Sequence, residues 1–239
     1  MLKIALLGYG KMGKEIEKIA LSRDHEIPLI IDIDNFTDLN EKNLKKVDVA
    51  IDFSIPGSAY ENIIKCFEAN TPVVSGTTGW LDKFEEVKKL CGEKNQTFFY
   101  ASNYSLGVNL FFKLNEHLAQ MMNHFNNYEV SMTEIHHIHK LDAPSGTAIS
   151  LAEGIIKNLD RKKQWTLLPG TGEASVNIEA IREDEIPGTH TIRYDSPVDT
   201  IEITHCTKNR QGLALGAVVA AEFIVGKKGF FNMDHLLNL

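Results

Sequence analysis

The glycine-rich segment near the start of the chain restricts its fold more than any other feature. Residues 3–7 (KIALL) predict a buried strand, and residues 11–21 carry apolar side chains at helical spacing. Between them lies Gly8-Tyr9-Gly10-Lys11-Met12-Gly13, a G-x-G-x-x-G pattern in the strand–turn–helix context of a dinucleotide site. The glycines permit the tight turn, the approach of a pyrophosphate and close helix–strand packing. The free N–H groups of the first helical turn then favour a phosphate.

An acidic residue follows where this pattern predicts one. The second strand, residues 27–33, contains Asp32, which lies 19 residues after Gly13. A carboxylate there accepts hydrogen bonds from the adenosine ribose hydroxyls. The next residue is Ile33 and not an arginine, so a ribose 2′-phosphate would meet a carboxylate without an adjacent guanidinium. Asp32 followed by Ile33 therefore favours NADH over NADPH. The alternative is a structural one, in which the glycine turn binds no cofactor and Asp32 is an ordinary surface residue.

The order of the remaining elements predicts an α/β chain with two domains. In the first part, strands are expected at residues 47–53, 72–75 and 97–101, and helices at residues 57–69 and 80–91. This β-α-β alternation implies a parallel sheet covered by helices. After about residue 104 come helices at 106–122 and 147–158, a loop at 160–174, and strands of alternating polarity at 128–136, 175–182, 189–194 and 199–206. A last apolar helix is expected at 214–225.

We therefore predict a Rossmann dinucleotide-binding domain formed by residues 1–104 and 214–239. Residues 105–213 are expected to form a second, α+β domain built on a mixed or antiparallel sheet, because their strands alternate like a sheet with one wet face.

Charge and cysteine content exclude several classes of protein. The net charge is −7 and the richest basic run is Arg161-Lys162-Lys163, so we expect no nucleic-acid partner. No apolar run is long enough to span a membrane, and the N-terminal segment lacks the pattern of a signal peptide, so a cytoplasmic protein is expected. Cys66, Cys91 and Cys206 are odd in number and form no C-x-x-C pair, which predicts reduced thiols.

Three of the nine histidines lie within Glu134-Ile135-His136-His137-Ile138-His139-Lys140. A metal site is one interpretation, but adjacent residues of a strand face opposite ways, so His136 and His137 would point apart, and we expect no metal. A second interpretation is that these histidines have only a structural role. A proton-handling, anion-binding site is the third: if the strand continues, His136 and Lys140 share a face, and an imidazole suits general acid–base catalysis.

The segment that follows favours the third interpretation. Residues 141–148 turn the chain sharply and begin a helix, which Ser145 or Thr147 can cap. Gly146 exposes the backbone N–H groups at that position. A capped helix N-terminus beside an ammonium group and imidazoles is a receptor for a carboxylate.

Residues 134–148, EIHHIHKLDAPSGTA, resemble the signature E-x-H-H-x-H-K-x-D-x-P-S-G-T-A of the dihydrodipicolinate reductases. Four further segments are similar to parts of that family: GYGKMG to its cofactor turn, Val49–Ser54 to its D-F-S/T segment, Gly76–Gly79 to its G-T-T-G loop, and Ala101–Asn109 to its interdomain junction. The chain departs from many members at Ile138, where they carry a basic residue, and in a shorter glycine turn.

The resemblance implies a reductase that uses NADH, NADPH or both on a small cyclic dicarboxylate in lysine and diaminopimelate synthesis. It implies that His136 donates and accepts a proton, that Lys140 donates a proton to the ring, and that His137, Gly146 and Thr147, next to the capping residue Ser145, hold the carboxylates. The cofactor groove would be lined by Gly8 to Gly13, Asp32, Gly76, Thr77, Thr78, Ala101, Ser102, Asn103 and Tyr104. The second domain would also form the interface of a homotetramer.

Two other functions remain open. A semialdehyde dehydrogenase would need a catalytic cysteine, and the three cysteines lie outside any such motif. A redox sensor would bind a dinucleotide without turnover and would not need the pair His136 and Lys140.

Overall fold

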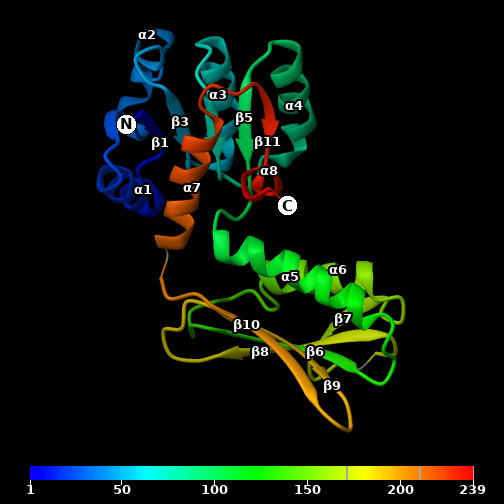
Figure 1. The fold of residues 1–239 in the computed structure, drawn as a ribbon. Helices are drawn as coiled ribbons and strands as arrows, with labels where there is room; N and C mark the ends of the chain where they lie inside the picture. Colours follow the sequence, from blue (N-terminus) through cyan, green and yellow to red (C-terminus); the bar gives the residue numbers. More distant parts are fainter. Residues whose placement is uncertain (171, 210, 239) are drawn as a thin grey trace. The chain divides into compact units, whose positions relative to one another are not determined.

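The computed structural model describes residues 1–170, 172–209 and 211–238, and it divides the chain into two compact units. The first unit is Met1–Leu106 with Gln211–Leu239, and the second is Gly107–Arg210. Each unit contains one sheet (Figure 1).

The first unit is built on six parallel strands in the order β11-β5-β4-β3-β1-β2. The strands are β1 (Lys3–Leu7), β2 (Glu26–Ile31), β3 (Val49–Asp52), β4 (Val73–Ser75), β5 (Thr97–Tyr100) and β11 (Gly229–Phe231). The helical segments are α1 (Lys11–Ser22), η1 (Ile33–Asp38), α2 (Glu41–Leu44), α3 (Pro56–Glu68), η2 (Leu81–Lys83), α4 (Phe84–Glu93), α7 (Gln211–Ile224) and α8 (Met233–Leu237).

Helices cover both faces of this sheet, which explains why its central strands are almost wholly apolar. One face packs in a core with α1 and α7, and the other with α3 and α4. The chain returns to this unit after residue 210, and α7 lies beside α1 (Figure 1).

The second unit has a mixed sheet in the order β10-β9-β6-β8-β7. Strands β9 and β10 pair antiparallel, β9 also pairs antiparallel with β6, and β6, β8 and β7 run parallel. Its elements are α5 (Leu106–Met122), β6 (Glu129–His136), α6 (Gly146–Asn158), β7 (Gln164–Leu167), β8 (Ser175–Arg182), β9 (Thr189–Asp195) and β10 (Thr200–Cys206). Helices α5 and α6 lie on one face of this sheet (Figure 1), and their apolar side chains form a core with it.

The predicted fold class is confirmed, but some elements differ from the prediction. The segment 160–174 is not a loop throughout, because residues 164–167 add strand β7 to the edge of the second sheet beside β8. The short elements η1, α2, β11 and α8 were not predicted, since each has too few residues to show a period. Among the described residues, the helices are too short or too polar to cross a membrane.

Candidate active site

The glycine turn after β1 is held by close backbone packing. Gly8 has a φ of +93°, and a Cβ there would lie 2.3 Å from the carbonyl oxygen of Phe53. A Cβ on Gly13 would lie 2.3 Å from the oxygen of Gly8, whereas a Cβ on Gly10 would meet nothing within 4 Å. Two of the glycines are therefore required by the protein itself, while the space beside Gly10 is open.

A pocket of about 440 Å³ opens at that position. Its lining comes from the segments that follow β1, β3 and β4 and consists of Gly10, Lys11, Met12, Phe53, Ser54, Pro56, Gly76, Thr77 and Thr78. In open parallel sheets, ligands bind at the carboxyl ends of the strands, where these segments lie. Gly10 caps α1 without a side-chain hydrogen bond, so the first N–H groups of the helix remain available to a phosphate. These residues fit a dinucleotide.

A buried carboxylate lies beneath this pocket. Asp52, at the end of β3, is 0% exposed and accepts hydrogen bonds from Ser54 Oγ (2.7 Å), Asn62 Nδ2 (2.9 Å), Ser75 Oγ (2.9 Å) and Thr77 Oγ1 (2.8 Å). Burial raises the pKa of Asp52, and the four hydrogen bonds oppose that rise. Because Ser54 and Thr77 belong to the pocket lining, Asp52 fixes the two loops that carry them.

The other predicted cofactor residues lie in the same unit but do not belong to the pocket lining. The hydroxyl of Tyr9 donates to Glu17. Asp32 is exposed at the end of β2 and accepts a hydrogen bond from the N–H of Ile33 (2.9 Å). In the segment Ala101–Tyr104, Ser102 is exposed, while Tyr104 is 1% exposed and its hydroxyl donates to the Ser75 oxygen (2.7 Å).

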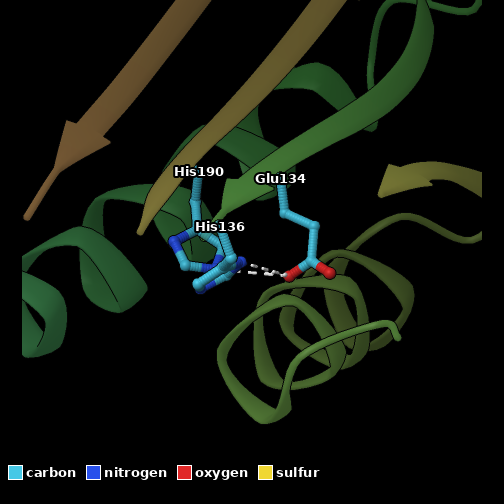
Figure 2. A group of neighbouring side chains, drawn as sticks. All are labelled: Glu134, His136 and His190. Carbon is cyan, nitrogen blue, oxygen red and sulfur yellow. Dashed lines mark ion pairs between the residues drawn. The ribbon is translucent and has the colours of Figure 1, made fainter. Parts of the chain in front are cut away.

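The end of strand β6 places a polar cluster on the face that is apolar elsewhere in the second unit. Alternate residues of β6 are buried, and in this series Glu134 and His136 follow two apolar residues. Glu134 lies opposite His190 of β9, and His136 lies opposite Arg182 of β8. Figure 2 shows the carboxylate of Glu134 facing the imidazoles of His136 and His190.

Glu134 is 1% exposed and has four partners. The N–H of Ser145 donates to both carboxylate oxygens (3.1 Å each), and Arg182 Nη2 donates to Oε1 (3.2 Å). The Nδ1 of His136 lies 3.4 Å and the Nε2 of His190 3.7 Å from Oε2. The carboxylate thus joins the two imidazoles, the guanidinium and the start of α6.

The two histidines of this cluster are held neutral. Burial, aided by the neighbouring His136, lowers the pKa of His190 to about 4. Burial also lowers the pKa of His136, against the opposing charge of Glu134. At neutral pH both imidazoles are therefore uncharged, and each can accept a hydrogen bond through its unprotonated ring nitrogen.

The ligand atoms of Glu134, His136 and His190 lie within 4.8 Å of one another, a grouping that could hold a metal ion. This grouping was not predicted, because the pairing of β9 with β6 brings His190 beside Glu134. Two imidazoles and a carboxylate are a set that zinc accepts, but Arg182 and the N–H of Ser145 already bind this carboxylate. The expected absence of a metal stays a prediction.

Helix α6 begins as the sequence predicts. Ser145 is the N-cap residue, and its Oγ accepts a hydrogen bond from the N–H of Ala148 (3.2 Å). The same oxygen lies 3.1 Å from Nε2 of His190, which fixes the rotamer of the cap. The helix therefore begins at Gly146 and Thr147 under a capping residue that is tied to the cluster.

Lys140 does not lie on the strand. Strand β6 ends at His136, so the condition under which His136 and Lys140 would share a strand face is not met; residues 137–140 form a turn, with the Lys140 N–H bonded to the His137 oxygen (3.1 Å). The Lys140 Nζ binds both oxygens of the exposed Asp142 (2.8 and 2.9 Å), and the ammonium lowers the pKa of Asp142. His137 is half-buried.

Sequence reasoning assigned no role to Glu134, Arg182 or His190. One signal was available for His190: it shares the parity of Ile192 and Tyr194 in β9, so a polar residue stands on a core-facing position. For the cysteines, the structure agrees with the sequence in giving no sign of catalysis. Cys66 and Cys91 are buried, and burial raises the pKa of Cys91 to about 11, which argues against a catalytic thiolate at either position.

Comparison with known protein families covers both units. Residues 2–104 match the family described as "Dihydrodipicolinate reductase, N-terminus", and residues 107–237 match "Dihydrodipicolinate reductase, C-terminus".

Individual proteins agree with these family matches. The 4-hydroxy-tetrahydrodipicolinate reductase of Christiangramia forsetii is 50% identical over 99% of this chain and 98% of its own length. That of Wigglesworthia glossinidia brevipalpis is 34% identical, over 99% and 93%. The fold resembles the dipicolinate-bound dihydrodipicolinate reductase of Paenisporosarcina sp. TG-14, with a TM-score of 0.81, 24% identity and 97% of each chain covered.

Proposed function

The chain belongs to the dihydrodipicolinate reductase family, and from that premise we propose how its two units divide the work of one enzyme. It is an NAD(P)H-dependent oxidoreductase, a 4-hydroxy-tetrahydrodipicolinate reductase of lysine and diaminopimelate synthesis. The first unit binds the dinucleotide in the pocket beside Gly10, and the second unit holds the cyclic dicarboxylate near Lys140 and the start of α6.

One observation carries this assignment. A lysine ammonium, two neutral imidazoles and the N-terminus of a capped helix come from one segment and its partners at the end of β6. This arrangement attracts a carboxylate and can supply a proton, which are the two demands of a cyclic imine dicarboxylate.

The reduced nicotinamide supplies a hydride to the substrate ring when it is bound. In our proposal Lys140 donates the proton that neutralises the charge left on the ring. The lowered pKa keeps His136 uncharged, so its imidazole can accept a hydrogen bond from the Lys140 ammonium before that proton transfer. His137 and the N–H groups of Gly146 and Thr147 orient the carboxylates, next to Ser145, and a substrate carboxylate replaces Asp142 as the partner of Lys140.

For the cofactor we propose NADH in preference to NADPH. The exposed Asp32 follows β2, and its carboxylate would accept hydrogen bonds from ribose hydroxyls but repel a 2′-phosphate. The support is a charge argument, and exchange of Asp32 for Asn is expected to raise the relative efficiency with NADPH.

We further propose a cytoplasmic homotetramer that binds neither nucleic acid nor membranes. The support is the family resemblance and the acidic charge of −7. Light scattering coupled to size exclusion is expected to give four copies of 26.8 kDa.

The test of the function is oxidation of NADH and NADPH with the cyclic substrate made in situ by a synthase. Substrate-dependent oxidation by the wild type, lost in Lys140→Ala and His136→Ala, is expected. Cofactor binding without substrate-dependent oxidation would reject the reductase in favour of a dinucleotide sensor.

A further inference from the structure

The segment between β6 and α6, residues 137–145, carries Lys140 and ends at the cap of α6, yet it has no regular secondary structure. We call it the β6–α6 loop. Two charged residues outside it, Glu134 and Arg182, hold it at several points, and neither has a role in the mechanism above.

Arg182, at the end of β8, reaches the middle of the loop. Its Nε donates to the Lys140 oxygen (3.3 Å), and its Nη2 donates to the Asp142 oxygen (2.6 Å). The same Nη2 donates to Glu134 Oε1 (3.2 Å). A planar guanidinium can serve these three acceptors together, whereas an ammonium group of similar charge lacks the fork that spans them.

Glu134 holds the end of the loop. Both of its oxygens accept the N–H of Ser145, the residue that caps α6. The side chain is 1% exposed, while that of Arg182 is 20% exposed. The pair therefore joins two neighbouring strands to the Lys140–Asp142 turn and to the helix start, through hydrogen bonds that are buried at Ser145 and exposed at Asp142.

We infer that Glu134 and Arg182 are positioning residues, which hold the β6–α6 loop so that Lys140 and the N-terminus of α6 face the substrate together. The inference rests on the proposed function. Neither residue needs to touch the substrate, because they act on backbone atoms of the residues that do. A displacement of about 1 Å in such a group costs about 100-fold in rate.

The first experiment compares Glu134→Gln, Arg182→Lys and the double variant. Matched controls on the same sheet are Glu179→Gln and Arg193→Lys, whose side chains lie at exposed positions. Each single variant is expected to lower kcat about 100-fold, with the Kd for NADH unchanged and the controls at wild-type rates. The double variant should be no slower than the slower single one, since the pair acts as a unit. Losses that multiply would overturn the inference.

The second experiment separates positioning from simple stabilisation. Replacing the pair by Glu134→Met with Arg182→Leu keeps the volume, and such apolar exchanges of buried ion pairs often preserve folding. We expect a folded protein, by circular dichroism and thermal unfolding, that still turns over about 100-fold slower than wild type. Wild-type turnover in this variant would overturn the inference, even if Glu134→Gln alone fails to fold.

A binding readout keeps the result distinct from the proposed function. Calorimetry with pyridine-2,6-dicarboxylate is expected to show about tenfold weaker binding to Arg182→Lys than to wild type or Arg193→Lys. If wild type binds this probe but shows no turnover, the proposed reaction fails while the effect of Arg182 on the loop is still measured. Equal binding by all three proteins would overturn the inference.

Discussion

Asp52 and Glu134 are the two buried carboxylates of the described residues, and they lie under different sites with different partners. Asp52 receives hydrogen bonds from four neutral side chains, all within residues 54–77. Glu134 faces a guanidinium from β8, imidazoles from β6 and β9, and the backbone N–H of the residue that caps α6. Asp52 thus holds two loops through neutral hydrogen-bond donors, whereas Glu134 compensates the positive charge of Arg182.

This difference follows from what each site must hold. A dinucleotide phosphate is bound by backbone N–H groups, which need precise loop positions but no protonatable side chain. A proton transfer needs ionisable groups whose charge is set by their neighbours. We therefore expect changes around Asp52 to alter cofactor affinity and changes around Glu134 to alter turnover.

The largest effect should come from exchanging one lysine in each unit. Lys140→Ala is expected to lower kcat by about 10²–10⁴-fold, the usual contribution of a general acid, with an unchanged Kd for NADH. Lys11→Ala, in the pocket lining, should weaken NADH binding with much less effect on kcat. Steady-state kinetics and fluorescence titration with NADH measure the two quantities.

His235→Gln, at a site remote from both lysines in sequence and exposed on α8, serves as a control for the lysine exchanges. The division between the units is wrong if Lys140→Ala weakens NADH binding as much as it lowers turnover.

Stability should separate the two carboxylates as well. Glu134→Gln leaves the guanidinium of Arg182 facing a neutral amide, and loss of one partner of a buried pair costs about 3 kcal/mol. Asp52→Asn should cost about 1 kcal/mol, because the hydroxyls of Ser54, Ser75 and Thr77 can turn to accept from the new amide. Urea unfolding of both variants gives the comparison, and an equal cost would mean that Arg182 is well solvated.

The two sites also differ in how far the sequence could predict them. The cofactor turn is local, so the spacing of Gly8, Gly10 and Gly13 between a strand and a helix was enough to locate it. The cap at Ser145 is local in the same way. Arg182 and His190 lie 48 and 56 residues from Glu134 in the chain, and they reach it only through the pairing of β8 and β9 with β6.

The alternation of residues along one strand does not show which other strand it pairs with, so the pairing of β8 and β9 with β6 could not be predicted. Strand β7 was not predicted for the same reason. Strand β7 has four residues, and it exists because β8 offers a free edge. Neighbouring side chains likewise determine the state of His190, whose pKa no local pattern encodes.

Acid should destabilise the second unit through His190. Its pKa of about 4 lies below the ordinary value of 6.5, so the folded state binds fewer protons than the unfolded state between these pH values. The contribution to stability is present above pH 6.5 and is lost as the pH falls to about 4, by about 3 kcal/mol. In His190→Gln the unfolding free energy should fall less over this range.

The groups that face His190 set the background for that measurement. His136, His205 and Lys140 lower its pKa together with burial, and Glu134 raises it. All four remain in His190→Gln, so the difference between variant and wild type isolates the single imidazole. Parallel curves for the two proteins between pH 4 and 7 would show that the pKa of His190 does not change on folding, contrary to this prediction.

The smallest expected effect tests whether the open space at Gly10 is there for the cofactor. A Cβ at this position meets no protein atom within 4 Å, so Gly10→Ala should unfold at the wild-type temperature. The methyl group would occupy the space through which a pyrophosphate approaches the backbone, and NADH should bind about tenfold more weakly.

Gly92→Ala, in α4, also meets nothing within 4 Å and should leave NADH binding unchanged. In Gly13→Ala the methyl group would lie 2.3 Å from the Gly8 oxygen, so that variant should lose stability as well as affinity. Wild-type affinity in Gly10→Ala would mean that the phosphates lie elsewhere along the turn.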